Sequence, residues 1–193
     1  MTILKFKNID RVTKSKIIGQ LSKDDAAALT AELTLNIDKF GTHPNFHNGI
    51  KRFNAFDNTS SMHIHNMDME FKLYDDNRPA FPNTMEIITR YLKEDMSKLA
   101  RVYWLRVEPG QFVRLHADTA CNYHHTVKRY QFFLDAPRDF VVVTDGELWN
   151  LYDDKKLTNA VLEFNKEDYH YYANHCKGIT CYMLIADFGP YSR

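Results

Sequence analysis

A histidine and an aspartate stand two residues apart near the end of the β-prone segment 111–118. Because alternate side chains of a strand share a face, we expect Arg114, His116 and Asp118 to point the same way. An imidazole nitrogen and a carboxylate oxygen suit Fe(II) and other first-row divalent ions. Taken alone, however, such a pair is more typical of a polar surface strand or turn.

A third candidate ligand, His170, lies several predicted strands later, in the aromatic segment Tyr169–Asn174. Together with His116 and Asp118 it would complete a facial triad of two histidines and one carboxylate, which leaves open positions on an iron ion. The alternative for His170 is a half-buried histidine whose ring is satisfied by a hydrogen bond. The three residues together predict a metal centre.

Short β-prone runs follow one another from Arg101 onward, and turn signals such as Pro109-Gly110 and Asp145-Gly146 separate them. Many short strands with little helix between them predict antiparallel strands in a sandwich or barrel. The runs are 101–107, 111–117, 129–134, 139–144, 159–164 and 180–188. We therefore expect a mainly β fold, a double-stranded β-helix (a cupin-like jelly roll) with supporting N-terminal helices.

Two earlier segments have helical periodicity, with apolar residues at steps of three and four. Ser22 with Asp25, and Asn83 with Glu86, are placed as capping pairs. Both helices are expected to pack on the sheet. The apolar positions are Ala26, Leu29, Leu33, Ile37 and Phe40 in the first segment, and Met85, Ile88, Leu92, Met96 and Leu99 in the second.

The length of 193 residues suits one domain. We expect residues 1–100 to form a helical buttress with outer strands, and residues 101–193 to form the β-helix core with the metal site. Short runs at Met62–Ile64 and Glu70–Tyr74 could be outer strands. No linker or repeat divides the chain.

Composition limits the possible partners and the compartment. Lys plus Arg equals Asp plus Glu at 25 each, so no global positive field favours nucleic acid. No apolar run is long enough to cross a membrane, and the first residues lack a signal-peptide pattern. The three cysteines have no C-x-x-C spacing, which argues against a disulfide framework or a thiolate zinc site. A cytoplasmic protein with reduced thiols is expected.

Between Arg101 and Asp187 the chain resembles the aspartyl/asparaginyl β-hydroxylase family of Fe(II)/2-oxoglutarate oxygenases, which includes proline 3-hydroxylase-like enzymes. The resemblance rests on the order and separation of several short elements. These are Arg106–Gly110, His116-Ala117-Asp118, Lys128–Gln131 ahead of Pro137, Gly146–Trp149, His170 with Asn174, and Leu184–Asp187.

The resemblance implies that His116, Asp118 and His170 are the metal ligands. Arg129 matches an arginine that helps to bind carboxylates, for which a guanidinium fork is well suited. Asn174 matches a position beside the distal histidine. Where the family usually carries the arginine that anchors 2-oxoglutarate, this chain has Cys181. The cations that could compensate are Arg129, Lys128, Arg114 and Lys177.

The function implied by the resemblance is a dioxygenase that hydroxylates an amino acid, free or within a peptide or protein. It would use Fe(II), 2-oxoglutarate and molecular oxygen, and would release succinate and CO2. Two alternatives stay open. One is a cupin-like metalloenzyme that uses another metal for hydrolysis or isomerisation. The other is a non-catalytic jelly-roll binding module.

Two further histidine pairs are weaker candidates for the site. His63 and His65 would share a strand face, and a surface loop is preferred for them over substrate contact. His124 and His125 lie on a predicted loop, where they could touch substrate or simply be exposed.

Overall fold

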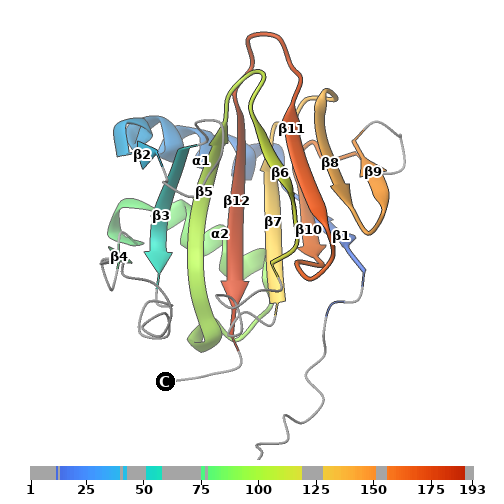
Figure 1. The fold of residues 1–193 in the computed structure, drawn as a ribbon. Helices are drawn as coiled ribbons and strands as arrows, with labels where there is room; N and C mark the ends of the chain where they lie inside the picture. Colours follow the sequence, from blue (N-terminus) through green and yellow to red (C-terminus); the bar gives the residue numbers. More distant parts are fainter. Residues whose placement is uncertain are drawn as a thin grey trace, which may run out of the picture.

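The computed structural model describes residues 12, 14–39, 41–42, 51–57, 75–76, 78–118, 128–150 and 156–189. Within these ranges the protein consists of two antiparallel sheets that face each other, with two helices on the outer face of the larger sheet (Figure 1). We call these the major and the minor sheet.

The major sheet has eight strands in the order β1-β10-β7-β12-β5-β3-β2, with β4 paired to β3. Most of its long strands come from the C-terminal half, but β1 and β3 belong to the first 57 residues. The bounds are β1 Lys16–Gln20, β2 Gly41–Thr42, β3 Lys51–Asp57, β4 Asp75–Asp76, β5 Leu99–Val107, β7 Lys128–Leu134, β10 Ala160–Phe164 and β12 Cys181–Phe188.

The minor sheet has four strands in the order β6-β11-β8-β9. Its bounds are β6 Phe112–His116, β8 Phe140–Thr144, β9 Glu147–Trp149 and β11 His170–Asn174. From β5 to β12 the chain repeatedly crosses between the sheets: β5, β7, β10 and β12 join the major sheet, and the other four join the minor one. This arrangement is a double-stranded β-helix, so the predicted fold class is confirmed.

The tight turns of the core lie where the sequence predicts them. Gly110 has φ 78°, and Asp145 and Gly146 have φ 54° and 70°. Two consecutive left-handed residues are the geometry of a two-residue hairpin, and Asp-Gly is a preferred pair for it. All six predicted strands form. The strands that were not predicted are β1, β2, β3, β4, β9 and β11.

The first helix, α1 (Lys23–Leu35), begins as predicted, because the Ser22 side chain accepts a hydrogen bond from the Asp25 amide. The second helix, α2 (Pro82–Leu92), begins differently: its N-cap is Phe81, and the predicted Asn83–Glu86 capping pair is wrong. The carboxylate of Glu32 on α1 accepts instead from the amides of Asn83 and Thr84 at 2.7 and 2.9 Å. This buried carboxylate joins the two helices.

Two apolar clusters make up the core. One joins the helices to the outer face of the major sheet, around Leu29, Ile88 and Trp104. The other fills the space between the two sheets, around Phe133 and Met183. Among the described residues, neither helix combines the length and the apolar character needed to cross a membrane. Because strands from both halves share the major sheet, we keep one domain over residues 1–193 as a proposal.

Candidate metal centre

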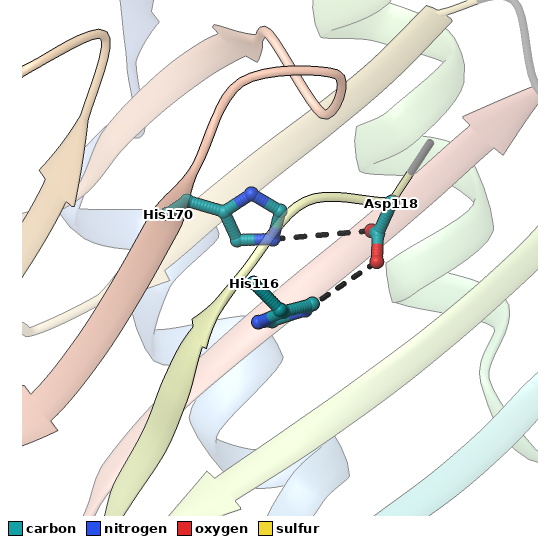
Figure 2. Close-up of side chains that lie close together, drawn as sticks. All are labelled: His116, Asp118 and His170. Carbon is teal, nitrogen blue, oxygen red and sulfur yellow. Dashed lines mark ion pairs between the residues drawn. The ribbon is translucent and has the colours of Figure 1, made fainter. Parts of the chain in front are cut away.

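The three predicted metal ligands converge at one end of the space between the sheets. His116 is the last residue of β6 and His170 is the first residue of β11, and the two are antiparallel partners across the minor sheet. Asp118 follows β6 by two residues, and its carboxylate faces both imidazole rings (Figure 2). Strand pairing thus brings together residues that are 54 positions apart in the chain.

The distances fit a single small ion. The Nε2 atom of His116 lies 3.4 Å from Oδ1 of Asp118, and Nε2 of His170 lies 3.9 Å from Oδ2. One ligand atom from each residue lies within 4.8 Å of the others, and within the described ranges these three residues form the cluster that could hold a metal. Neighbouring ligands of a first-row ion with bonds near 2.1 Å are about 3 Å apart, so small side-chain adjustments suffice.

A β-bulge orients His116 toward the site. The register of β11 with β6 shifts between His170 and Tyr172, so that Tyr172 pairs with Val113. Arg114 and Leu115 are both exposed, whereas Val113 is buried. The expectation that Arg114 shares a face with His116 by strict alternation is therefore wrong, because the extra residue in β6 breaks the two-residue period.

Both imidazoles are held by backbone carbonyls. The Nδ1 atom of His116 lies 2.7 Å from the carbonyl oxygen of Arg114, and Nδ1 of His170 lies 2.9 Å from that of Asp168. A carbonyl can only accept, so Nδ1 carries the proton in each neutral ring, and the Nε2 lone pair faces Asp118. Hydrogen bonds of this kind fix the tautomer and the ring orientation of metal-binding histidines.

The two histidines differ in burial and in pKa. His170 is almost fully buried beside the rings of Phe164 and Tyr172, and burial lowers its pKa to about 4. His116 is half-buried; burial acts to lower its pKa, but hydrogen bonds to Asp118 and to the Arg114 carbonyl raise it overall. A neutral His170 is the form that binds a metal.

Arg129 orients the third ligand. It lies at the start of β7 and donates from Nη1 to Oδ2 of Asp118 and from Nε to Oδ1 of Asp187, the latter at 2.7 Å. Burial acts to raise the pKa of Asp118, but the charge of Arg129 holds it well below its usual value. Asp118 is therefore a carboxylate at any ordinary pH.

Arg129 belongs to a buried row of charges that crosses the major sheet. The register places Arg101 of β5, Asp187 of β12, Arg129 of β7 and Phe164 of β10 side by side. Nε of Arg101 donates to Asp187 at 3.1 Å. Burial acts to raise the pKa of Asp187, while Arg129 and Arg101 lower it overall. Asp187 accepts hydrogen bonds from both arginines of this row. The resemblance includes Asp187 only as the end of its last element.

The structure does not bring Lys128 to the site. Its ammonium contacts Glu94 at 2.8 Å, and Tyr130 donates to the same carboxylate. Adjacent residues of β7 point to opposite faces of the sheet, so Lys128 lies on the helix side while Arg129 points toward the triad. These positions do not favour a cofactor role for Lys128 or for the exposed Arg114, and both roles stay predictions.

Asn174 also lies away from the triad. It ends β11, four residues from His170, which corresponds to about 13 Å of extended chain. Its amide donates to the carbonyls of Val107 and Ile179, both at 2.8 Å, and accepts from the Cys176 amide. These bonds join β11 to the neighbouring chain segments, so the side chain is not placed to contact a ligand on the triad.

Cys181 begins β12 opposite Val107, six residues from Asp187 and about 20 Å along the strand. It lies in the apolar cluster between the sheets, and burial raises the pKa of its thiol to about 12. The exposed Lys177 lies in the connection between β11 and β12 at the same end. Neither residue supplies a cation near the triad.

Two polar groups near the triad were not singled out from the sequence. Gln131 donates from Nε2 to the hydroxyl of Tyr172 at 2.5 Å, while its buried Oε1 lacks a hydrogen-bond partner within the described part of the chain. The carbonyl of Lys166 accepts from the Asp118 amide at 2.9 Å, and the Lys166 side chain is buried. No local signal in the sequence marks Lys166, because it lies in a turn beyond the end of β10.

His63, His65, His124 and His125 lie outside the described residues, as do the possible strands Met62–Ile64 and Glu70–Tyr74.

The fold and the centre together define a class: a double-stranded β-helix with a two-histidine, one-carboxylate cluster at one end. Solved structures with the same fold include a prolyl-4-hydroxylase from Pseudomonas putida, 16% identical, with a TM-score of 0.54 and 91% of each chain covered. Another is an oxidoreductase of the 2OG-Fe(II) oxygenase family from Burkholderia pseudomallei, 12% identical, with a TM-score of 0.60 over 89% of this chain and 82% of the other.

A third structure, HygX from Streptomyces hygroscopicus, contains nickel and 2-oxoglutarate; it is 14% identical, with a TM-score of 0.56 over 90% of this chain and 81% of the other. At these identities the likeness establishes the fold. No protein-family model matches the chain, and no curated protein matches it. The narrower resemblance to the aspartyl/asparaginyl β-hydroxylase family therefore stays a prediction.

Proposed function

We propose that this chain is an Fe(II)- and 2-oxoglutarate-dependent dioxygenase that hydroxylates an amino acid, either free or within a peptide or protein. The proposal rests on the convergence of His116, Asp118 and His170, in which both Nε2 atoms and one carboxylate face a common point. The structural neighbours of known type, prolyl hydroxylases and HygX among them, support the reaction class by their shared fold.

The donor set fits iron. Two neutral imidazoles and one carboxylate leave part of the coordination sphere open, as in the non-haem Fe(II) oxygenases. The bound iron would supply oxygen activation, in which one atom of O2 oxidises 2-oxoglutarate to succinate and CO2 and the other is inserted into a substrate C–H bond to give the alcohol.

The chain itself prepares this chemistry. The carbonyls of Arg114 and Asp168 hold the two imidazoles with Nε2 facing the common point. Arg129 holds Asp118 in its ionised form and fixes the direction of its carboxylate. The rings of Phe164 and Tyr172 bury His170 and exclude water from that side.

An anaerobic titration tests the proposal directly. Fe(II) and then 2-oxoglutarate are added to the apoprotein, and the visible charge-transfer absorption of the chelate is followed. We expect a band in the wild type. His116→Ala should weaken Fe(II) binding by more than about 100-fold. The reason is that losing a residue that only hydrogen-bonds to a metal ligand already weakens metal binding by up to about 100-fold. His175→Ala, which removes an exposed histidine at the other end of β11, should leave the band unchanged.

The second stage of the test is turnover with oxygen. The amount of succinate formed should equal the amount of 2-oxoglutarate consumed. The rate of succinate formation should rise when a hydroxylatable amino acid or peptide from a screened panel is present. Iron binding without a chelate band would contradict the proposal and favour a cupin-like metalloenzyme. A wild type that binds no iron would favour a binding module.

A further inference from the structure

Lys166 lies at the end of the barrel where the metal ligands meet. It follows β10 in the turn that leads to β11, and its carbonyl accepts a hydrogen bond from the Asp118 amide. Its position is two residues beyond Phe164, whose ring packs against His170. The exposed fraction of the Lys166 side chain is 8%. A long cationic side chain is therefore buried beside the triad.

Among the described cations at this end with little exposure, Lys166 has the most distant counterion. Arg101 and Arg129 both donate to Asp187, and Arg129 also donates to Asp118. Within the described part of the chain, the ion pair of Lys166 is a contact of 3.9 Å with Glu167, whose own side chain is 44% exposed. Because this contact is long, the ammonium remains available to pair with an anion that a ligand supplies.

Positive charges exceed negative charges among the side chains with little exposure at this end, which favours the binding of an anion. Among the described residues, three cations with little exposure, Arg101, Arg129 and Lys166, accompany two carboxylates with little exposure, Asp118 and Asp187, and the more exposed Glu167. Burial, followed by the charge of Arg129, lowers the pKa of Lys166. A divalent metal on the triad would increase the positive excess.

We propose that the ammonium of Lys166 binds the far carboxylate of 2-oxoglutarate, in place of the arginine that the resemblance expects where Cys181 stands. This inference rests on the proposed function. The positions of the other candidate cations are less suited to binding this carboxylate. Lys128 lies on the helix side of the sheet, and Arg114 and Lys177 are exposed. A lysine needs no fixed fork geometry, so one ammonium on a flexible stem can pair with the carboxylate as a point charge.

The test compares two keto acids on the same iron. 2-Oxopentanoate has the chain length of 2-oxoglutarate but a methyl group in place of the far carboxylate. Each acid is titrated anaerobically into the Fe(II) form of the wild type, Lys166→Met, Lys166→Arg and Lys177→Met, and the charge-transfer band gives the dissociation constant. Lys177→Met is the matched control, because it removes an exposed lysine at the opposite end.

In Lys166→Met we expect 2-oxoglutarate to bind at least about 10-fold more weakly, as for loss of a charge-assisted hydrogen bond. Binding of 2-oxopentanoate should change by less than about twofold. Lys166→Arg should retain most of the preference for 2-oxoglutarate, and Lys177→Met all of it. Fe(II) affinity of Lys166→Met should be unchanged or higher, because a nearby positive charge is removed.

Two results would overturn the inference. Equal weakening of both keto acids would show that Lys166 supports the fold or the metal and does not recognise the far carboxylate. Unchanged binding of 2-oxoglutarate in Lys166→Met would place the anchor elsewhere. Both results require a band in the wild type, so they are distinct from failure of the proposed function, in which the wild type gives no band with either acid.

Discussion

The two ends of the space between the sheets differ sharply in chemistry, although the same strands form both. At the triad end, β5, β12 and β7 present Arg101, Asp187 and Arg129 to the interior. At the other end the same strands present Leu105, Met183 and Phe133, which are buried in an apolar cluster.

This contrast separates stability from chemistry. Apolar packing stabilises the barrel by removing hydrocarbon from water, whereas buried ion pairs largely repay their own desolvation and stabilise little in net terms. The charged row is therefore best understood as the structure that orients Asp118 and sets the positive potential of the site. The apolar end holds the sheets together so that this row stays in place.

The largest effect on stability is expected at the apolar end. Phe133→Ala removes a fully buried ring that packs against Phe140 and should lower the free energy of unfolding by about 3–5 kcal/mol. Fe(II) affinity of the folded protein should change by less than about twofold. Ile179→Ala, at an exposed position of the same end, should cost less than about 0.5 kcal/mol.

Denaturant unfolding and Fe(II) titration measure the two quantities. If Phe133→Ala weakened metal binding as strongly as it destabilised the fold, the two ends would not be separate in function.

A slightly smaller effect is expected from the charged row. Arg129→Met leaves Asp118 without its arginine and Asp187 with Arg101 alone, and should lower the free energy of unfolding by about 3 kcal/mol. The neighbouring Lys128→Met breaks a partly exposed pair with Glu94 and should cost about 1 kcal/mol or less. Both values come from urea unfolding of the metal-free protein.

Fe(II) offers a second readout for this pair of variants. Bound iron supplies positive charge beside Asp118, so it should raise the midpoint of unfolding more in Arg129→Met than in Lys128→Met. Equal losses of stability in the two variants would contradict the structural role of the charged row.

The smallest of the three effects is expected from Asn174→Leu. This change keeps the shape of the side chain but leaves the carbonyls of Val107 and Ile179 without their donor, at a cost of about 2 kcal/mol. Because Asn174 lies at the end remote from the triad, the affinity for 2-oxoglutarate should stay the same. A fall in that affinity, measured with the charge-transfer band, would support the cofactor role that the resemblance implies.

The ligand set could be predicted because it depends on residue types and on local order. His116, Asp118 and His170 are recognisable as metal-ligand types, and the alternation around His116 and Asp118 indicates a strand. The anchor position could not be predicted in this way. Lys166 lies in a turn between strands, and nothing in its neighbours along the chain distinguishes it from an exposed lysine. Its carbonyl pairs with the amide of Asp118, a contact between segments that are distant in the chain.

By itself, the sequence determined the alternating strands, the Asp145-Gly146 turn and the Ser22 cap, because each depends on interactions among residues close in the chain. Only the tertiary structure decided the bulge that turns His116 inward, the capping of α2 by Glu32, and the separation of Lys128 and Asn174 from the triad. The physical reason is that register and burial arise from contacts between distant segments. A shift of one residue reverses which side chains face the site, and local patterns do not fix it.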